Sequence, residues 1–254
     1  MGAENYTLGK GILYFDRYQN GAYSGYRDLG NAPSFSFNVN IEKLEHFSSR
    51  GGLRVKDKEI ISQLTPSCSF TLDEITAENF EILGLATIDD QSQAAATGES
   101  ETIAAVVGKV TLAKRGIKNV SVVAGSTTLV AGTDYTIGAA DAKAGQINFI
   151  DSTDVQAAIT ASEDFVITYD CDAVDLKVVK LFTETEVIGR LKFVSDNPTG
   201  TQCTLVAKSV SLTPSGDTAF IGDDWSTLSF SCECLKSSAP EDADSPYIDI
   251  IMES

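Results

Sequence analysis

The sequence has no long hydrophobic run. None of its apolar stretches approaches the ~20 residues that a membrane-spanning helix needs. Its first residues, MGAENYTLGKG, lack the basic and apolar regions of a secretory signal. We therefore expect a chain that is made and kept in cytosol-like solvent, without insertion into a membrane.

Positive charge is also scarce. The 254 residues include 19 Lys and Arg against 36 Asp and Glu, a formal net charge of −17. A protein that binds duplex DNA needs a basic footprint to neutralise phosphates, so this balance argues against ordinary DNA binding. Composition alone favours the simple interpretation that acidic surfaces keep the protein dispersed. A second interpretation is an acidic wall that repels DNA and prevents it from sticking.

Catalytic and metal-binding patterns are weak. The single histidine, His46, has no Ser or Cys at a motif spacing, so no catalytic triad is predicted. The acidic stretch Asp170–Asp175 matches a calcium loop for three residues and then lacks the glycine of the turn. Asp223 and Asp224 precede Trp225, but adjacent strand residues point to opposite faces, which favours a turn. We predict no enzyme, no cofactor and no metal.

The cysteines are few and odd in number: Cys68, Cys171, Cys203, Cys232 and Cys234. On apolar strand faces, reduced thiols behave as small hydrophobic groups. Cys232 and Cys234 would share one strand face, but this pair without histidine or a second pair is weak evidence for a metal. We expect reduced cysteines and no disulfide.

What the sequence does contain is strict alternation between Ser34 and Glu42, which predicts a β-strand with one buried and one wet face. The apolar side carries Phe35, Phe37, Val39 and Ile41, and the polar side carries Ser36, Asn38, Asn40 and Glu42. A second alternating strand covers residues 67–73.

The segment between these strands is a polar arm that is longer than most connections in compact domains. It holds His46, Arg50, Gly51, Gly52, Arg54, Lys56 and Lys58, a concentration of basic residues in an acidic chain. The two glycines permit a sharp bend. We interpret the arm as a contact with something outside its own subunit, and a solvated loop is an equal alternative on these residues alone.

The remaining pattern predicts strands and one helix. The helix would begin after Thr76 as N-cap and end at Gly84. Further strands are expected at residues 6–18, 174–186, 187–195, 202–212 and 226–235, with an edge strand at 247–252.

A compositional change at residues 89–101 indicates a linker, because apolar periodicity is lost there. Residues 102–170 are rich in Val, Thr and Ala and alternate short strands with turns, as in a small all-β sandwich. Its strands are expected at residues 106–113, 119–124, 127–130, 134–137, 146–150 and 165–169. The predicted organisation is a first half (1–90), a linker (91–101), an inserted all-β domain (102–170), a second half (171–238) and an acidic tail (239–254).

The order of these pieces resembles the major tail tube proteins of long-tailed, siphovirus-like bacteriophages. The elements that carry the resemblance are GKGILYFDRY (9–18), GYRDLGN (25–31), LEHFSSRGGLRVKDKE (44–59), SFTLDEITAENF (69–80) and GDDWSTLSFSCECL (222–235). Within the insert, TTLVAGTDYTIG and GQINFI resemble small immunoglobulin-like decoration modules.

The resemblance implies a mainly β subunit of the tail-tube sandwich or barrel type, with one short helix, a long inter-ring loop and an outward-facing insert. Such subunits form rings, usually of six copies, that stack into a hollow tube for ejection of double-stranded DNA. Implied partners are further copies of the chain and the tail terminator, tail tip or baseplate, and tape measure proteins. The protein would be assembled in the host cytoplasm and kept in the virion.

On this resemblance the arm becomes the inter-ring loop, and the polar strand faces become candidates for the lumen wall. These are Ser36, Asn38, Asn40 and Glu42 with Ser229, Ser231 and Glu233. Either strand could equally present its polar face outward.

Two other functions fit the sequence. One is a carbohydrate-binding or adhesive β-module protein of a phage or bacterial surface, in which the insert alone would bind glycans. The other is the inner tube of a contractile injection system, although such tubes rarely carry an insert of this kind.

Overall fold

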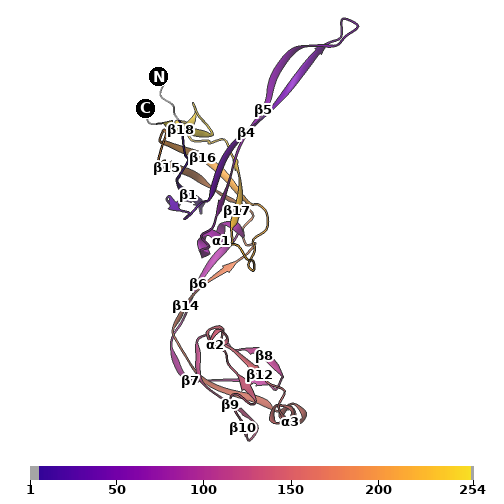
Figure 1. Ribbon diagram of the computed structural model, residues 1–254, viewed down its shortest axis with the longest axis vertical. Coiled ribbons are helices and arrows are strands. Elements are labelled where there is room, and N and C mark those ends of the chain that lie inside the picture. The colour runs from indigo at the N-terminus through magenta and orange to yellow at the C-terminus, as the bar shows by residue number, and fades with distance from the viewer. Residues whose placement is uncertain (1–5, 253–254) are drawn as a thin grey trace. The chain divides into compact units, whose positions relative to one another are not determined.

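The computed structural model describes residues 6–252, which divide into two compact units (Figure 1). Unit 1 contains residues up to 88 and from 179 onward, and unit 2 contains residues 89–178. The division falls within strands β6 (Thr87–Gln93) and β14 (Val174–Lys180), which pair in a two-stranded sheet. Residues 1–5 of the predicted first half and 253–254 of the predicted tail lie outside the described residues.

The predicted linker at residues 91–101 is wrong. Residues 91–93 belong to β6 and residues 96–101 to β7 (Ala96–Ala104), which pairs with β13 (Asp164–Cys171) over most of its length. β7 lies at the edge of its sheet, where a strand is covered by a neighbour on one side only. A polar sequence without apolar periodicity is compatible with such an edge position, which is why periodicity did not reveal the strand.

A nine-stranded antiparallel sheet forms most of unit 1. Its main order is β2-β1-β15-β16-β17-β5-β4, with β18 paired to β16 and β3 paired to β1. The strands are β1 (Gly11–Gln19), β2 (Ala22–Tyr23), β3 (Arg27–Asp28), β4 (Ser34–Ser48), β5 (Val55–Leu72), β15 (Val187–Ser195), β16 (Cys203–Pro214), β17 (Leu228–Cys234) and β18 (Ile248–Met252). The end strands β2 and β4 are not paired with each other in the described chain, so the sheet is open and forms no closed barrel.

One face of this sheet carries the core of unit 1. Phe70 of β5 and Phe230 of β17 are buried and stack with ring centroids 4.8 Å apart. Phe35 of β4 stacks on Phe193 of β15 at 5.3 Å, although these strands are not neighbours in the sheet. The sheet therefore curls over its own core, as a strongly twisted sheet must when one face is apolar.

The predicted helix is confirmed as α1 (Ala77–Leu83). The Thr76 hydroxyl oxygen accepts a hydrogen bond from the Asn79 backbone N–H at 3.1 Å, and the Gly84 N–H donates to the Phe80 carbonyl. Phe80 lies partly buried against the core of unit 1, which holds the helix on the sheet. In the part of the chain that the structure describes, no helix has the length and apolar character to cross a membrane.

Unit 2 has its own core between two antiparallel sheets. One sheet has the order β10-β9-β13-β7 and the other β11-β12-β8. The strands not yet bounded are β8 (Gly108–Thr111), β9 (Ile117–Ala124), β10 (Thr127–Leu129), β11 (Tyr135–Thr136) and β12 (Gln146–Phe149). Phe149 and Phe165 are fully buried between the sheets and stack at 4.5 Å. All six strands predicted in the insert are confirmed, within a few residues at their ends.

Two helices correct the prediction of an all-β insert with a single helix elsewhere in the chain. α2 covers Ala139–Ala144 and α3 covers Thr153–Ala161. The Ser152 hydroxyl accepts from the Val155 N–H at 3.2 Å, so α3 has an N-cap of the expected type. Val155 and Ala158, three residues apart, are its buried positions. A helix with so few buried residues has little periodicity to detect.

Candidate assembly surfaces

The seven residues predicted to line a lumen lie on one face of the unit 1 sheet. Cross-strand register places Ser36 opposite Ser69 and Ser69 opposite Ser231. Directly opposed residues share a face, and so do alternate residues along a strand. Asn38, Asn40, Glu42, Ser229 and Glu233 therefore belong to the same face as Ser36 and Ser231.

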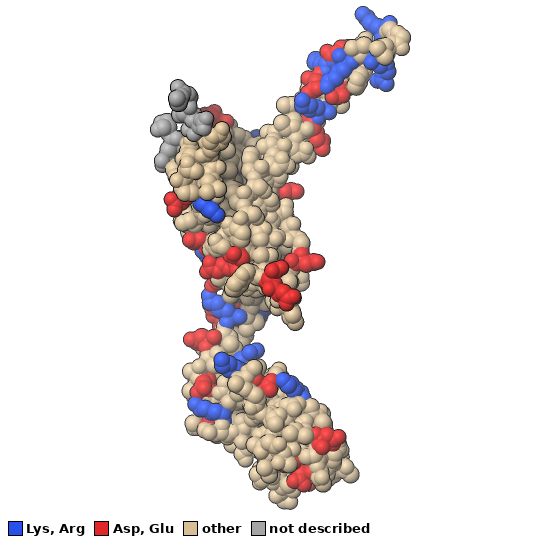
Figure 2. All heavy atoms as spheres, in the orientation of Figure 1, with Lys and Arg blue, Asp and Glu red and all other residues tan. Residues whose placement is uncertain are grey.

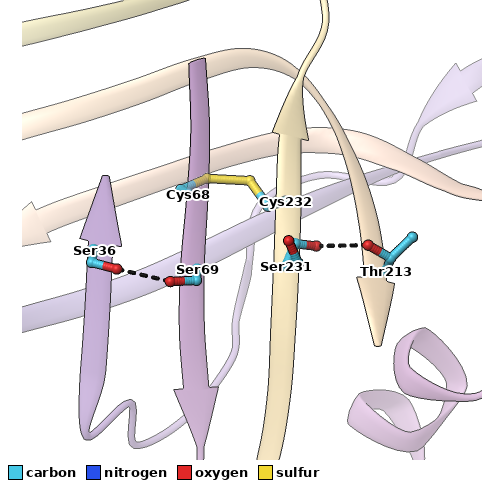
Figure 3. Close-up of a disulfide and its surroundings, with 6 residues drawn as sticks. All are labelled: Ser36, Cys68, Ser69, Thr213, Ser231 and Cys232. Atoms are coloured by element: carbon cyan, nitrogen blue, oxygen red, sulfur yellow. Dashed lines mark hydrogen bonds between the residues drawn. A yellow bond between two sulfur atoms is a disulfide. The ribbon is translucent and has the colours of Figure 1, made fainter. Parts of the chain in front are cut away.

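This face is a continuous polar band over four strands. The band residues are Ser36, Asn38, Asn40 and Glu42 on β4, Gln63, Thr65, Ser67, Ser69 and Thr71 on β5, Ser229, Ser231 and Glu233 on β17, and Ser211 and Thr213 on β16. The Ser36 and Ser69 hydroxyl oxygens are 2.8 Å apart, and the Thr213 hydroxyl donates to the Ser231 carbonyl at 3.3 Å (Figure 3). Glu42 and Glu233 are the charged residues of the band, so its charge is entirely negative.

The opposite, apolar face of β5 and β17 carries a disulfide. Cys68 and Cys232 are register partners on these strands, and their Cα atoms are 4.9 Å apart (Figure 3). The prediction of reduced cysteines without a disulfide is therefore wrong for this pair. Its two members are 164 residues apart in sequence, and only the pairing of β5 with β17 brings them together.

Cys234 lies beside this disulfide. It shares a strand face with Cys232, as the two-residue spacing predicts, and the sulfur atoms of Cys68, Cys232 and Cys234 all lie within 4.8 Å of one another. Two of the three are bonded to each other, and burial raises the pKa of the Cys234 thiol to about 11. This group does not offer the deprotonated ligands that a metal ion requires.

Replacing Cys232 with serine is expected to lower the free energy of unfolding of unit 1 by about 2–5 kcal/mol. The disulfide closes a long loop, so its loss increases the conformational entropy of the unfolded chain and favours unfolding. The new hydroxyl would occupy a fully buried position among apolar side chains. Denaturant unfolding under non-reducing conditions measures the effect. The control is Cys203→Ser at a half-buried free thiol, and a Cys232→Ser curve that overlays the wild type would contradict the prediction.

The hairpin formed by β4 and β5 extends past the neighbouring strands (Figure 1). β17 pairs with β5 only from Ser67 to Leu72, so the remainder of the hairpin is paired only within itself. Phe37, Val39 and Ile41, which the alternation placed on a buried face, are 39%, 40% and 44% exposed. That prediction is wrong beyond Phe35, because no other layer among the described residues of unit 1 covers this side of the hairpin.

The predicted inter-ring loop is also corrected, because most of the arm is strand. His46 lies on β4, Lys56 and Lys58 lie on β5, and the connection between the strands is the short hairpin tip, residues 49–54. Arg50, Gly51, Gly52 and Arg54 belong to this tip. The charged residues of the arm disrupt simple alternation. The register between β4 and β5 also shifts at two positions, after Glu42 and after His46, and both effects hid the strands from sequence analysis.

Acidic residues neutralise part of the basic charge of the arm. Lys56 forms ion pairs with Glu45 and Glu59, and Lys43 forms a second ion pair with Glu59. These side chains are partly exposed to solvent, so the pairs add little to stability and mainly fix side-chain positions.

Glu59 is expected to titrate at unusually low pH. Hydrogen bonds from Lys43 and then from Lys56 lower the pKa of Glu59 from 4.5 to about 2. Because the pKa is lower in the folded chain, this interaction favours folding above pH 4.5 and is lost as the pH falls toward 2. NMR detection of the Glu59 carboxyl carbon measures the midpoint. Lys43→Gln should raise it, and a wild-type midpoint near 4.5 would mean that the ion pairs do not form.

Free positive charge remains at the tip. The Arg54 guanidinium lies 5.5 Å from the centroid of the Phe47 ring. Next to the tip, His46 of β4 contacts Asp57 of β5. Arg50 has no ion pair within the described residues. Figure 2 shows mixed charges along the outer part of the hairpin and basic side chains at its end.

A surface that the sequence did not identify is the loop between β16 and β17, residues 215–227, which we call the aromatic loop. Its side chains Phe220, Ile221 and Trp225 are 79%, 96% and 92% exposed. Asp217, Asp223 and Asp224 are its charged residues, and it contains no Lys or Arg. Asp223 and Asp224 lie outside any strand, as predicted. Large apolar side chains gathered in an exposed loop are typical of an interaction surface.

The acidic stretch that partly matched a calcium loop lies in unit 2, where two of its carboxylates have other partners. Asp170 accepts hydrogen bonds from the Asn119 side chain at 2.7 Å and from the Gly98 backbone at 2.9 Å, and Asp172 pairs with Lys118.

Two comparisons with known proteins bear on this chain. The search of curated proteins finds no match. A sequence model of one protein family matches residues 6–251, nearly the whole chain. The chain therefore belongs to the family described as Protein of unknown function UCP028589.

Proposed function

We propose that this chain is a structural virion protein whose stacked rings form the hollow tail tube of a long-tailed bacteriophage. The polar band of unit 1 carries the proposal. It is rich in hydroxyl and amide groups, and Glu42 and Glu233 are its charged residues. DNA phosphates bind through ion pairs with Lys and Arg. A wall without them would let double-stranded DNA pass without sticking.

Ring formation would use the surfaces that the single chain leaves uncovered. β4 is an edge strand with one unpaired side, and Phe37, Val39 and Ile41 remain partly exposed on it. Long apolar edge strands invite association with another chain. In a ring of six copies, as in the resembling family, the adjacent subunit would cover this edge, and the tail-tube sandwich or barrel would be completed between subunits.

Stacking of rings would use the β4–β5 hairpin in place of the predicted inter-ring loop. A contact between different surfaces of identical copies does not close on itself and produces a filament. Tail terminator, tail tip or baseplate, and tape measure proteins would bind the ends or the interior of this filament. Assembly would occur in the host cytoplasm, and unit 2 would face outward as a decoration module.

Negative-stain electron microscopy across a concentration series tests the proposal. We expect rings or hollow tubes of uniform width, and the same chain in purified tailed virions. Protein that stays monomeric at every concentration and is missing from the tails of virions would refute the proposal. The control is a variant with Val39→Lys and Ile41→Lys, which places charge on the uncovered face of the hairpin and should prevent assembly without unfolding the subunit.

A further inference from the structure

We infer that the aromatic loop of one copy is the docking surface for the hairpin tip of a second copy. This inference rests on the proposed function, because it assigns the two surfaces that would join successive rings.

The first step is the placement of the two surfaces within unit 1. The hairpin tip adjoins Val55, the first residue of β5. The aromatic loop is followed by Leu228, which pairs with Leu72, the last residue of β5. β5 has 18 residues. At about 3.3 Å per residue, they span roughly 55–60 Å. A single chain cannot bring the two surfaces together, whereas a second copy aligned head to tail can.

The second step is their opposite charge. The hairpin tip contains Arg50 and Arg54 and no acidic residue, together with Leu53, which is 77% exposed. The aromatic loop contains three aspartates and no basic residue, together with three exposed apolar side chains. The two surfaces therefore carry opposite charge, and both expose apolar side chains that could pack against each other. Opposite charges set orientation and register.

The third step is a hollow suited to an arginine side chain. Asn31, Asp73, Glu74 and Trp225 line a hollow of about 390 Å³. Asn31 holds both carboxylates, through its side-chain N–H groups to Asp73 and its backbone N–H to Glu74. Neither carboxylate has a cationic partner among the described residues. A guanidinium stacks favourably on a Trp ring and donates paired hydrogen bonds to carboxylates. We assign this hollow to Arg50 of the next copy.

The fourth step is the pair of glycines at the tip. Gly51 and Gly52 do not have the positive φ that favours glycine, and a Cβ added at Gly52 would meet no atom within 4 Å. The isolated chain therefore has no need of glycine at Gly52. A bare backbone at this position allows another surface to approach closely.

Charge reversal with rescue tests the contact. Arg54→Glu, or Asp223→Lys with Asp224→Lys, should raise the concentration needed for tube formation by more than about tenfold, because like charges would face each other. The variant carrying all three changes should assemble nearly as well as the wild type. Arg50→Glu should impair assembly in the same way, but the loop changes should not rescue it, because Asp73 and Glu74 remain acidic. Glu241→Lys with Asp244→Lys changes exposed acidic residues outside the loop and is the matched control.

A second readout uses the single tryptophan of the chain, Trp225. Its fluorescence should shift to shorter wavelength and lose access to acrylamide when tubes form, because its ring becomes covered. Tubes in which Trp225 stays accessible, or in which reversal of the loop charges has no effect, would overturn this inference while leaving the proposed function intact. Failure of the wild-type chain to form tubes, together with its absence from the tails of virions, would overturn both.

Discussion

Replacing Phe165 with alanine is expected to lower the melting temperature of unit 2 by roughly 15 °C or more while unit 1 melts as in the wild type. Phe165 is fully buried and stacks on Phe149, so its loss leaves a large cavity. Changes of this kind cost about 3–5 kcal/mol. Among the described residues, the core of unit 1 contains no residue of unit 2, and the core of unit 2 contains none of unit 1. The two units should therefore unfold in separate transitions, outside two-state behaviour.

The matched variant is Phe230→Ala, which removes the ring that stacks on Phe70 in unit 1. This variant should lower the melting temperature of unit 1 and leave the melting temperature of unit 2 unchanged. Phe182→Ala, at a side chain that is 81% exposed, should move neither transition. Differential scanning calorimetry resolves the two transitions. A single transition that both core variants shift equally would show that the units unfold together.

The same pair of variants separates the roles of the two units. Below the melting temperature of its weakened unit, the Phe165→Ala protein should form tubes as the wild type does, because the surfaces proposed for assembly all belong to unit 1. Phe230 lies on the strand that carries Ser229 and Ser231, so Phe230→Ala should impair assembly. Loss of tubes in the Phe165→Ala protein would assign unit 2 a part in assembly.

Sequence alternation predicted the elements that combine a buried and a wet face. Phe230 and Cys232 alternate with Ser229 and Ser231 on β17, and the structure buries the first pair and leaves the second partly exposed. The cap at Thr76 was equally visible, because its signal is local. These features depend on residues close together in sequence.

Features that depend on pairing between distant segments were not predictable. The disulfide and the polar band both need β17 to lie beside β5, and no local pattern specifies that neighbour. The prediction of burial was wrong on β4 for a related reason. Val39 and Ile41 alternate with polar residues as core residues do, but no layer of the described chain covers them. The sequence pattern of an apolar face is the same whether the face is covered by its own chain or by another copy. The exposed Trp225 was assigned to a structural turn, because exposure does not follow from its neighbours in sequence.

Replacing both Glu42 and Glu233 with lysine is expected to leave tube assembly intact and to reduce phage infectivity by at least about a hundredfold. Both side chains are exposed on the polar band and have no ion pair in the described chain, so folding should not depend on them. Each subunit would change by four units of charge, and a ring would present lysines to every phosphate that passes. Each new phosphate contact adds binding energy that DNA must lose before it moves on.

Salt dependence is the diagnostic measurement for this prediction, because contacts between lysine and phosphate weaken as counterions compete. DNA ejection from variant particles should recover as salt rises, whereas wild-type ejection should respond far less. Glu42→Gln with Glu233→Gln removes the negative charge without adding positive charge, and it should cause a small defect. Glu241→Lys with Asp244→Lys controls for added charge elsewhere on the chain. Because both glutamates share one face by register, a lysine at either position alone should produce part of the same defect. Normal infectivity of the double-lysine variant would contradict the assignment of the polar band to the lumen wall, even if the chain forms the tube.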